Sequence, residues 1–165
     1  MVQLIRQIGI CGVKDMQFKR ITTDDAAFLA EIFSIPEYDL YFAENDTTQE
    51  NWKERISEYY LSSNSYIISN GDEKVGWIMY SIEGDTCKID IIVLLPEKRH
   101  MGYGKAIFSD LIAANPQIKS IQLDVQQRNK AALSFYRKLG FVVEGEEMQP
   151  VGETEEPYFN LSLTI

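Results

Sequence analysis

The stretch between Ser65 and Pro96 constrains the fold more than any other part of the chain, because it alternates between β-forming runs and tight turns. The pair Asn70-Gly71 is the strongest short signal for a two-residue hairpin turn. We therefore expect three strands at residues 66–69, 74–82 and 86–95, separated by turns at Asn70-Gly71 and Glu83-Gly84-Asp85. Strands joined by such short turns pair as antiparallel neighbours, so this stretch predicts a three-stranded meander.

The residues on both sides of the meander predict further strands and four helices. Thr22 with Asp25, and Thr47 with Glu50, have the spacing of helix-capping boxes, and Pro36 ends the first helix. The expected strands are 16–21, 120–125, 141–147 and 158–163, and the expected helices are 22–35, 47–61, 102–114 and 129–139. The strands that flank helix 102–114 should be parallel, with a right-handed crossover. The sequence thus predicts an α/β fold with a mixed, mostly antiparallel central sheet of about seven strands and helices on both faces.

A length of 165 residues fits a single domain. We expect that domain to span residues 16–165, because residues 1–15 show no regular period. Residues 1–15 are then an N-terminal extension: an added edge strand, a cover for a neighbouring chain, or a loosely packed arm. Polar residues interrupt its apolar ones and no small-residue cleavage site follows, so it is not typical of a signal peptide.

Charge and cysteine content restrict the partners of the chain. The 16 Lys and Arg against 25 Asp and Glu give a net charge of −9, which disfavours nucleic acid and favours a cationic substrate or partner. No apolar run approaches the ~20 residues of a membrane span. Cys11 and Cys87 match no metal or redox spacing, so we expect no metal and two reduced thiols in a cytoplasmic protein, although one disulfide is not ruled out. A homodimer is compatible with these features.

A glycine-containing loop, Arg99-His-Met-Gly-Tyr-Gly104, follows a predicted strand and opens a predicted helix. Glycine lets the backbone approach a ligand, and the first helical N–H groups lack partners, so this position suits a phosphate group. We therefore expect position 104 to tolerate no side chain, because a Cβ there would obstruct the phosphates and strain the turn. Ile107 stands where the dinucleotide fingerprint requires Gly or Ala, and Ala106 where the Walker loop requires Ser or Thr. The alternative to a phosphate site is that this segment is only a tight turn between strand and helix, with charged side chains exposed to solvent.

A second motif lies between Asn129 and Leu139. Asn129 is a plausible helix N-cap, and Tyr136 lies seven residues later on the same helix face. Asp124 stands on the preceding strand. The alternative interpretation makes Asn129 only a cap and Tyr136 only a core residue.

Together the two motifs resemble those of the GNAT superfamily of acetyl-CoA-dependent N-acetyltransferases. The first resembles its Arg/Gln-x-x-Gly-x-Gly/Ala loop, and the second its Asn-x-x-Ala-x-x-x-Tyr helix. The predicted strand order agrees from about Met16 to the end of the chain. The resemblance implies acetyl-CoA as co-substrate and no metal. The cofactor-binding residues it implies are Ile92, Val93 and Leu94 for the pantetheine arm, Arg99, His100, Met101, Gly102, Tyr103, Gly104 and Lys105 for the pyrophosphate, and Asn129, Ala132 and Tyr136 on the second motif.

The resemblance also implies catalytic roles. Tyr136 would protonate the leaving thiolate, since a phenol with a pKa of ~10 stays protonated at neutral pH. Asp124 would take the proton of the amine, directly or through water, and Asp90 is the second candidate. The alternative for either carboxylate is an ordinary polar residue on the surface of a strand.

The implied function is the direct transfer of an acetyl group to a primary amine of a small molecule or peptide, in a ternary complex. The alternative is a non-catalytic acyl-CoA-binding or sensory module on the same fold. The expected acceptor rim is aromatic and acidic, which suits a cationic amine but is also typical of ordinary solubilising loops. Its residues are Glu37, Tyr38, Asp39, Tyr41, Phe42, Glu44, Glu153, Glu155 and Glu156.

Overall fold

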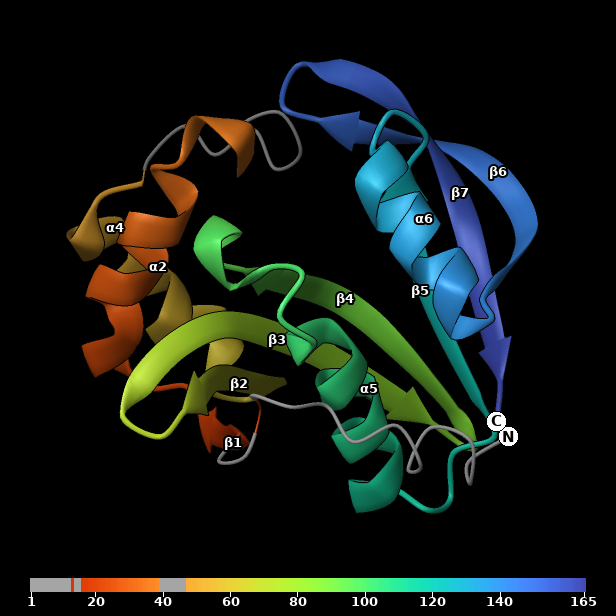
Figure 1. Ribbon diagram of the computed structural model, residues 1–165. Helices are drawn as coiled ribbons and strands as arrows, with labels where there is room; N and C mark the ends of the chain where they lie inside the picture. The colour runs from red at the N-terminus through yellow and green to blue at the C-terminus, as the bar shows by residue number, and fades with distance from the viewer. Residues whose placement is uncertain (1–12, 14–15, 39–46) are drawn as a thin grey trace.

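The computed structural model describes residue 13, residues 16–38 and residues 47–165, and it contains one seven-stranded sheet with the order β1-β2-β3-β4-β5-β7-β6 (Figure 1). The strands are β1 (Met16–Arg20), β2 (Asn64–Asn70), β3 (Glu73–Glu83), β4 (Thr86–Leu94), β5 (Ser120–Gln126), β6 (Val142–Val151) and β7 (Thr154–Thr164). The helices are α2 (Ala26–Phe33), α4 (Gln49–Arg55), α5 (Tyr103–Ala114) and α6 (Lys130–Leu139). The predicted order of elements is confirmed.

Every neighbouring pair of strands is antiparallel except β4 and β5, which are parallel. The predicted meander is β2-β3-β4, and its turns place Gly71 and Gly84 at φ values of 61° and 62°. Such positive φ angles cost glycine little and explain why these turns contain it. The predicted mixed, mostly antiparallel sheet is therefore confirmed.

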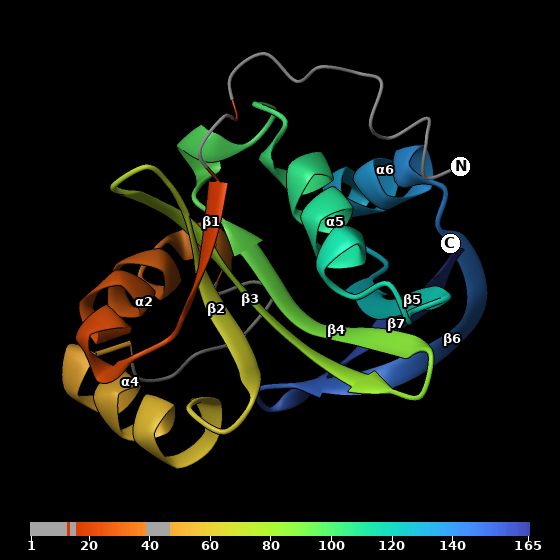
Figure 2. The same cartoon turned by 90° about the horizontal axis from the view of Figure 1, so that it is seen from below.

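The sheet separates two hydrophobic cores, with α2 and α4 on one face and α5 and α6 on the other (Figure 2). On the first face, Trp52 of α4 and Phe33 of α2 pack against Trp77 of β3. On the second face, Phe108 of α5 and Tyr136 of α6 meet at ring centroids 6.2 Å apart. Helices cover both faces of the sheet, as predicted.

Side-chain caps lie at the starts of the first two helical segments. Asp25 Oδ2 accepts a hydrogen bond from the Thr22 backbone N–H at 2.8 Å, as the Thr22–Asp25 spacing predicted. The second cap lies one residue later than predicted: Thr48, not Thr47, accepts from the Asn51 N–H at 3.3 Å. The helix then continues after Arg55 as a π-helical turn, Ile56–Tyr60.

The last two strands extend further toward their connecting turn than predicted. The β6–β7 hairpin extends past Pro150 and Pro157. Pro157 is tolerated because it lies beyond Tyr158, the last residue of β7 that pairs with β5. The predicted N-terminal extension, residues 1–15, and Cys11 lie outside the described residues, apart from Val13. None of the helices in the described ranges is long and apolar enough to cross a membrane.

Candidate active site

The parallel strands β4 and β5 separate partway along their length. Their ladder runs from Thr86 opposite Ser120 to Ile89 opposite Leu123, and β4 then continues to Leu94 without pairing to β5 (Figure 1). Residues Ile92, Val93 and Leu94 still pair with β3, so this part of β4 has one paired edge and one edge that β5 does not cover; the Leu94 carbonyl accepts a hydrogen bond from the Tyr38 hydroxyl. An open strand edge presents N–H and C=O groups that an extended, amide-containing ligand can bind.

A β-bulge lies where the two strands part. Tyr80 of β3 pairs with Ile89 and its neighbour Met79 pairs with Ile91, so Asp90 is an extra residue on β4. A bulge bends its strand and increases the local twist. The bulge at Asp90 therefore accounts for the divergence of β4 from β5, and the sequence showed no signal for it.

The glycine loop lies after β4, at the start of α5. Gly102 is the N-cap of α5 with φ 91°, and His100 has φ 60°. Within the described residues, no acceptor binds the backbone N–H groups from His100 to Lys105. Six consecutive N–H groups without an acceptor, at the N-terminus of a 12-residue helix, have the arrangement that favours binding of an anion.

The backbone strain that we expected at Gly104 is wrong. Its φ is not in the positive range, and an added Cβ would lie 2.7 Å from Cζ of Phe135 on α6. The side chain is therefore absent because α5 packs closely against α6. The glycine that the turn requires for its φ angle is Gly102.

Two cations at the start of the loop, Lys98 and Arg99, are paired with carboxylates. Lys98 Nζ lies 2.6 Å from Glu73 Oε1, and Arg99 Nη1 lies 2.6 Å from Glu37 Oε1. Arg99 also donates to the Tyr38 hydroxyl at 2.8 Å. His100 is exposed, and neither it nor Lys105 has an ion-pair partner in the described part of the chain.

The second motif forms α6 and its N-cap, and the structure confirms the predicted cap and the buried position of Tyr136. Asn129 Oδ1 accepts from the Ala132 N–H at 3.1 Å, so Asn129 is the N-cap. Tyr136 is 8% exposed and packs edge-on against Phe108 and Phe141. Burial raises the pKa of its phenol well above the usual value, so the group stays protonated at neutral pH. Its hydroxyl has no hydrogen-bond partner among the described residues, which leaves that proton available to a ligand.

Asp124 lies in a polar cluster on the sheet face that carries α2 and α4. Its Oδ1 accepts from Asn160 Nδ2 at 2.9 Å, and its Oδ2 accepts from Gln149 Nε2 at 3.3 Å. Lys88 Nζ lies 3.6 Å from Oδ2. We call this cluster the carboxylate face; its members are Lys88, Asp90, Asp124, Glu147, Gln149 and Asn160.

Asp90 is the second acidic member of the carboxylate face. Burial raises the pKa of its carboxyl group, Lys88 opposes that rise, and the charge of Asp124 adds to it. The Asp90 side chain is nevertheless exposed, so the desolvation is partial and a ligand can reach the group. Sequence reasoning named both carboxylates but missed Lys88, Gln149 and Asn160. Only the register that puts Asn160 opposite Asp124 identifies them.

The other expected acceptor residues are dispersed. Glu37 and Tyr38 contact Arg99, whereas Asp39, Tyr41, Phe42 and Glu44 lie outside the described residues. Glu153 and Glu155 are exposed at the tip of the β6–β7 hairpin, and Glu156 lies 3.6 Å from Arg128.

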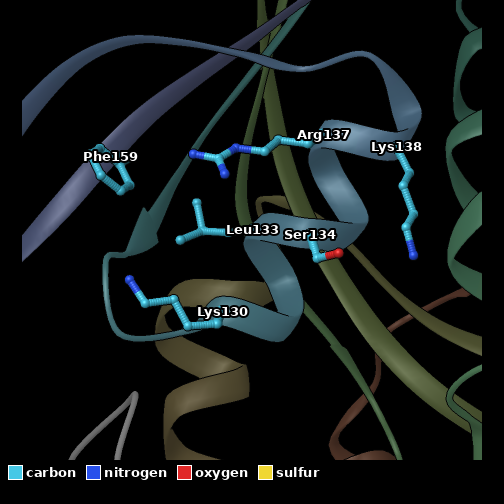
Figure 3. Close-up of a pocket in the computed structure, with 6 residues that line it drawn as sticks. All are labelled: Lys130, Leu133, Ser134, Arg137, Lys138 and Phe159. Atoms are coloured by element: carbon cyan, nitrogen blue, oxygen red, sulfur yellow. The ribbon is translucent and has the colours of Figure 1, made fainter.

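A surface hollow lies along α6, with Leu133 and Arg137 turned toward Phe159 of β7 (Figure 3). None of the predicted site residues lines it. The described ranges contain no group of three side chains suited to hold a metal ion.

Comparison with known proteins agrees with this geometry. The model of the acetyltransferase (GNAT) family matches residues 26–141. A peptidyl-lysine N-acetyltransferase, YjaB of Salmonella typhimurium, is 26% identical over 112 residues, which are 67% of this chain and 71% of that protein.

Two solved structures show the same fold at low sequence identity. An acetyltransferase of the GNAT family from Bacillus anthracis superimposes with a TM-score of 0.77 at 17% identity, over 92% of this chain and 96% of that one. A spermidine N-acetyltransferase from Vibrio cholerae, solved with CoA and spermine, gives a TM-score of 0.74 at 14% identity, over 91% and 95% of the two chains.

Proposed function

The chain belongs to the acetyltransferase (GNAT) family, and from this premise we propose that it transfers the acetyl group of acetyl-CoA to a primary amine of a peptide or small molecule. The transfer is direct, with both substrates bound together. One observation carries the proposal: the open edge of β4 lies beside the free N–H groups of the glycine loop. Coenzyme A has an amide-containing arm for the first and a pyrophosphate for the second.

The residues present fit coenzyme A. Ile92, Val93 and Leu94 would bind the pantetheine amides through the backbone, and the loop from His100 to Lys105 would bind the pyrophosphate. Lys105 adds a cation that no carboxylate neutralises in the described residues. Asn129 and Ala132 begin α6 directly after β5 and would line the opposite side of the opening.

Acetyl transfer requires a donor to the acyl oxygen, an acid for the leaving sulfur and a base for the amine. Bound acetyl-CoA supplies the thioester that the amine attacks. A backbone N–H on the open edge of β4 would donate to the acyl oxygen. Tyr136 would give its hydroxyl proton to the sulfur, since burial keeps the phenol protonated.

The surroundings of the two carboxylates favour Asp90 over Asp124 as the base. Asp124 uses both oxygens to accept hydrogen bonds from Asn160 and Gln149. Asp90 is exposed on the bulge at the opening, and burial of its carboxyl raises its pKa toward the pH at which the enzyme must accept protons. Asp124 would then add the negative charge that attracts an ammonium group.

The acceptor we propose is a cationic primary amine, such as a lysine side chain or a polyamine. The acidic pair on the carboxylate face supports this substrate class. The names of two similar proteins, a peptidyl-lysine N-acetyltransferase and a spermidine N-acetyltransferase, agree with it. The buried, unpaired Cys87 agrees with a cytoplasmic location.

The proposal is tested by turnover of acetyl-CoA with a panel of lysine peptides, polyamines and aminoglycosides, with free thiol as the readout. Thiol release that requires one class of amine, together with acetylated amine detected by mass spectrometry, supports the enzyme. Tight binding of acetyl-CoA without turnover of any amine would instead support the non-catalytic acyl-CoA-binding module.

A further inference from the structure

Arg99 begins the glycine loop, yet its guanidinium is held by residues from another part of the chain. One terminal nitrogen, Nη1, lies 2.6 Å from Glu37 Oε1, and the other, Nη2, donates to the Tyr38 hydroxyl at 2.8 Å. The guanidinium carbon lies 5.3 Å from the centroid of the Tyr38 ring. Both terminal nitrogens of Arg99 are therefore engaged by residues that follow α2.

Tyr38 connects this contact to β4. Its side chain is buried in the core between the sheet and α2, where its ring lies 6.1 Å from that of Phe33. Its hydroxyl donates to the backbone carbonyl of Leu94, the last residue of β4. Burial raises the pKa of Tyr38, so the hydroxyl keeps the proton that it donates to Leu94.

We propose that Arg99 is a positioning residue that acts through Tyr38 and is not a ligand of the cofactor phosphates. We call the chain of contacts Glu37–Arg99–Tyr38–Leu94 the Arg99 bridge. It fixes the end of β4 against the segment after α2. This inference rests on the proposed function in one respect: the end of β4 is the edge that would align the thioester.

Magnitudes separate the two roles of Arg99. The side chains of Arg99 and Glu37 are 30% and 45% exposed, so their ion pair is a surface contact whose loss changes an equilibrium by about 2–5-fold. A charged hydrogen bond to a phosphate contributes about 10-fold or more to affinity, and it weakens with added salt. Binding measurements at two salt concentrations therefore distinguish a bridge from a phosphate ligand.

The first experiment measures the coenzyme A affinity of Arg99→Gln by calorimetry at low and high salt. Lys105→Gln is the matched control, because it removes the same charge from the same loop at a site without a carboxylate partner. We expect Arg99→Gln to keep the wild-type Kd within about 3-fold and the wild-type salt dependence. Lys105→Gln should weaken binding by about 10-fold and reduce the salt dependence.

The second experiment measures turnover. Tyr38→Phe and Glu37→Gln each break the bridge and leave the charge of Arg99 in place. Both, like Arg99→Gln, should lower kcat by about 5–10-fold with the Kd of coenzyme A unchanged, because misalignment of the reacting groups affects the chemical step. The double variant Arg99→Gln with Tyr38→Phe should be no slower than the slower single variant, since both changes break one chain of contacts.

The opposite result is equally specific. A 10-fold loss of affinity in Arg99→Gln, with tighter binding in Glu37→Gln because that change frees the guanidinium, would make Arg99 a phosphate ligand. A double-mutant cycle on thermal unfolding measures the coupling between Arg99 and Tyr38 even if the protein binds no coenzyme A. Non-additive shifts in Tm for Arg99→Gln and Tyr38→Phe support the bridge, and strictly additive shifts overturn it.

Discussion

The two sides of the opening between β4 and β5 are built in different ways. The glycine loop is one contiguous segment, and the groups that it would offer to an anion are backbone N–H groups. The carboxylate face collects side chains from four strands, with Lys88 and Asp90 on β4, Asp124 on β5, Gln149 on β6 and Asn160 on β7. A backbone site is recognisable from a short motif, whereas a site assembled across strands depends on register.

This difference predicts which kind of change damages each side. Changes of side chain should matter most on the carboxylate face, where the chemistry is carried by side chains. The glycine loop should instead respond to changes that alter backbone conformation or helix packing. The variants below test that contrast, from the largest expected effect to the smallest.

Asp90→Asn should have the largest effect, a loss of about 10³-fold in kcat/KM at pH 7, with the acidic limb of the pH profile removed. Because the folded-state pKa of Asp90 is raised, its ionised form is disfavoured in the folded protein. Asp90→Asn should therefore raise Tm at neutral pH, and this gain should vanish as the pH falls below the pKa of the wild-type group.

The matched variant is Asp124→Asn, which changes the neighbouring carboxylate. We expect a smaller loss of activity and a retained acidic limb. Full pH–rate profiles with one accepted amine compare the two variants. If Asp124→Asn alone removes the limb, the base lies on β5; if neither variant does, both carboxylate assignments fail.

Tyr136→Phe should lower kcat by about 10²-fold while the KM for acetyl-CoA changes little. The ring and its contacts with Phe108 and Phe141 remain, and the lost hydroxyl has no partner in the described residues, so Tm should stay unchanged. Steady-state kinetics and a thermal melt check both statements. Wild-type kcat under conditions where chemistry limits the rate would make Tyr136 a core residue alone.

Gly104→Val should destabilise the fold by about 1–3 kcal/mol, because the new side chain meets Phe135. Shortening the neighbour with Phe135→Leu in the same chain should restore part of that loss. Gly102→Ala is the control: its cost comes from the positive φ, about 1–3 kcal/mol, and Phe135→Leu should not relieve it. Equal behaviour of the two glycine variants in chemical denaturation would contradict the packing role of Gly104.

Asn160→Ala should have the smallest effect. It removes the amide that donates to both Asp124 and Glu147, so we expect a loss of about 1 kcal/mol in stability and of a few-fold in kcat/KM. Gln149→Ala, whose bond to Asp124 is longer at 3.3 Å, should cost less. An unchanged activity in Asn160→Ala would show that the orientation of Asp124 does not depend on this neighbour.

Local signals predicted most of the fold. These signals involve contacts between residues at most four positions apart in the chain. They are the hairpin glycines, the Thr22–Asp25 cap and the Asn129 cap, and each lies at its predicted position. The N-cap of α4 was wrong by one residue, because Thr47 and Thr48 are chemically equivalent and local spacing does not rank them. The β6–β7 hairpin was predicted too short. A strand tolerates proline where no neighbouring strand needs its N–H group, and at Pro157 this depends on the β5–β7 ladder, which ends at Tyr158.

The candidate site was predicted unevenly for the same reason. The glycine loop and Tyr136 belong to short motifs, so residue spacing together with the resemblance to the GNAT motifs named them as candidates. The partners of the Arg99 side chain could not be predicted from the sequence, because Glu37 and Tyr38 lie 62 and 61 residues away in the chain. The close packing of Gly104 on Phe135 and the bulge at Asp90 likewise arise from elements that meet only after folding.

By itself, the sequence determined the order of helices and strands, the meander at the centre of the sheet and the glycine-containing turn before α5. These depend on periodicity, caps and φ preferences, which act over a few residues. Only the tertiary structure decided which residues surround Asp124 and Asp90, where β4 leaves β5, and that Arg99 pairs with Glu37 and Tyr38. Contacts between distant segments depend on strand register and helix packing, and no single segment encodes them.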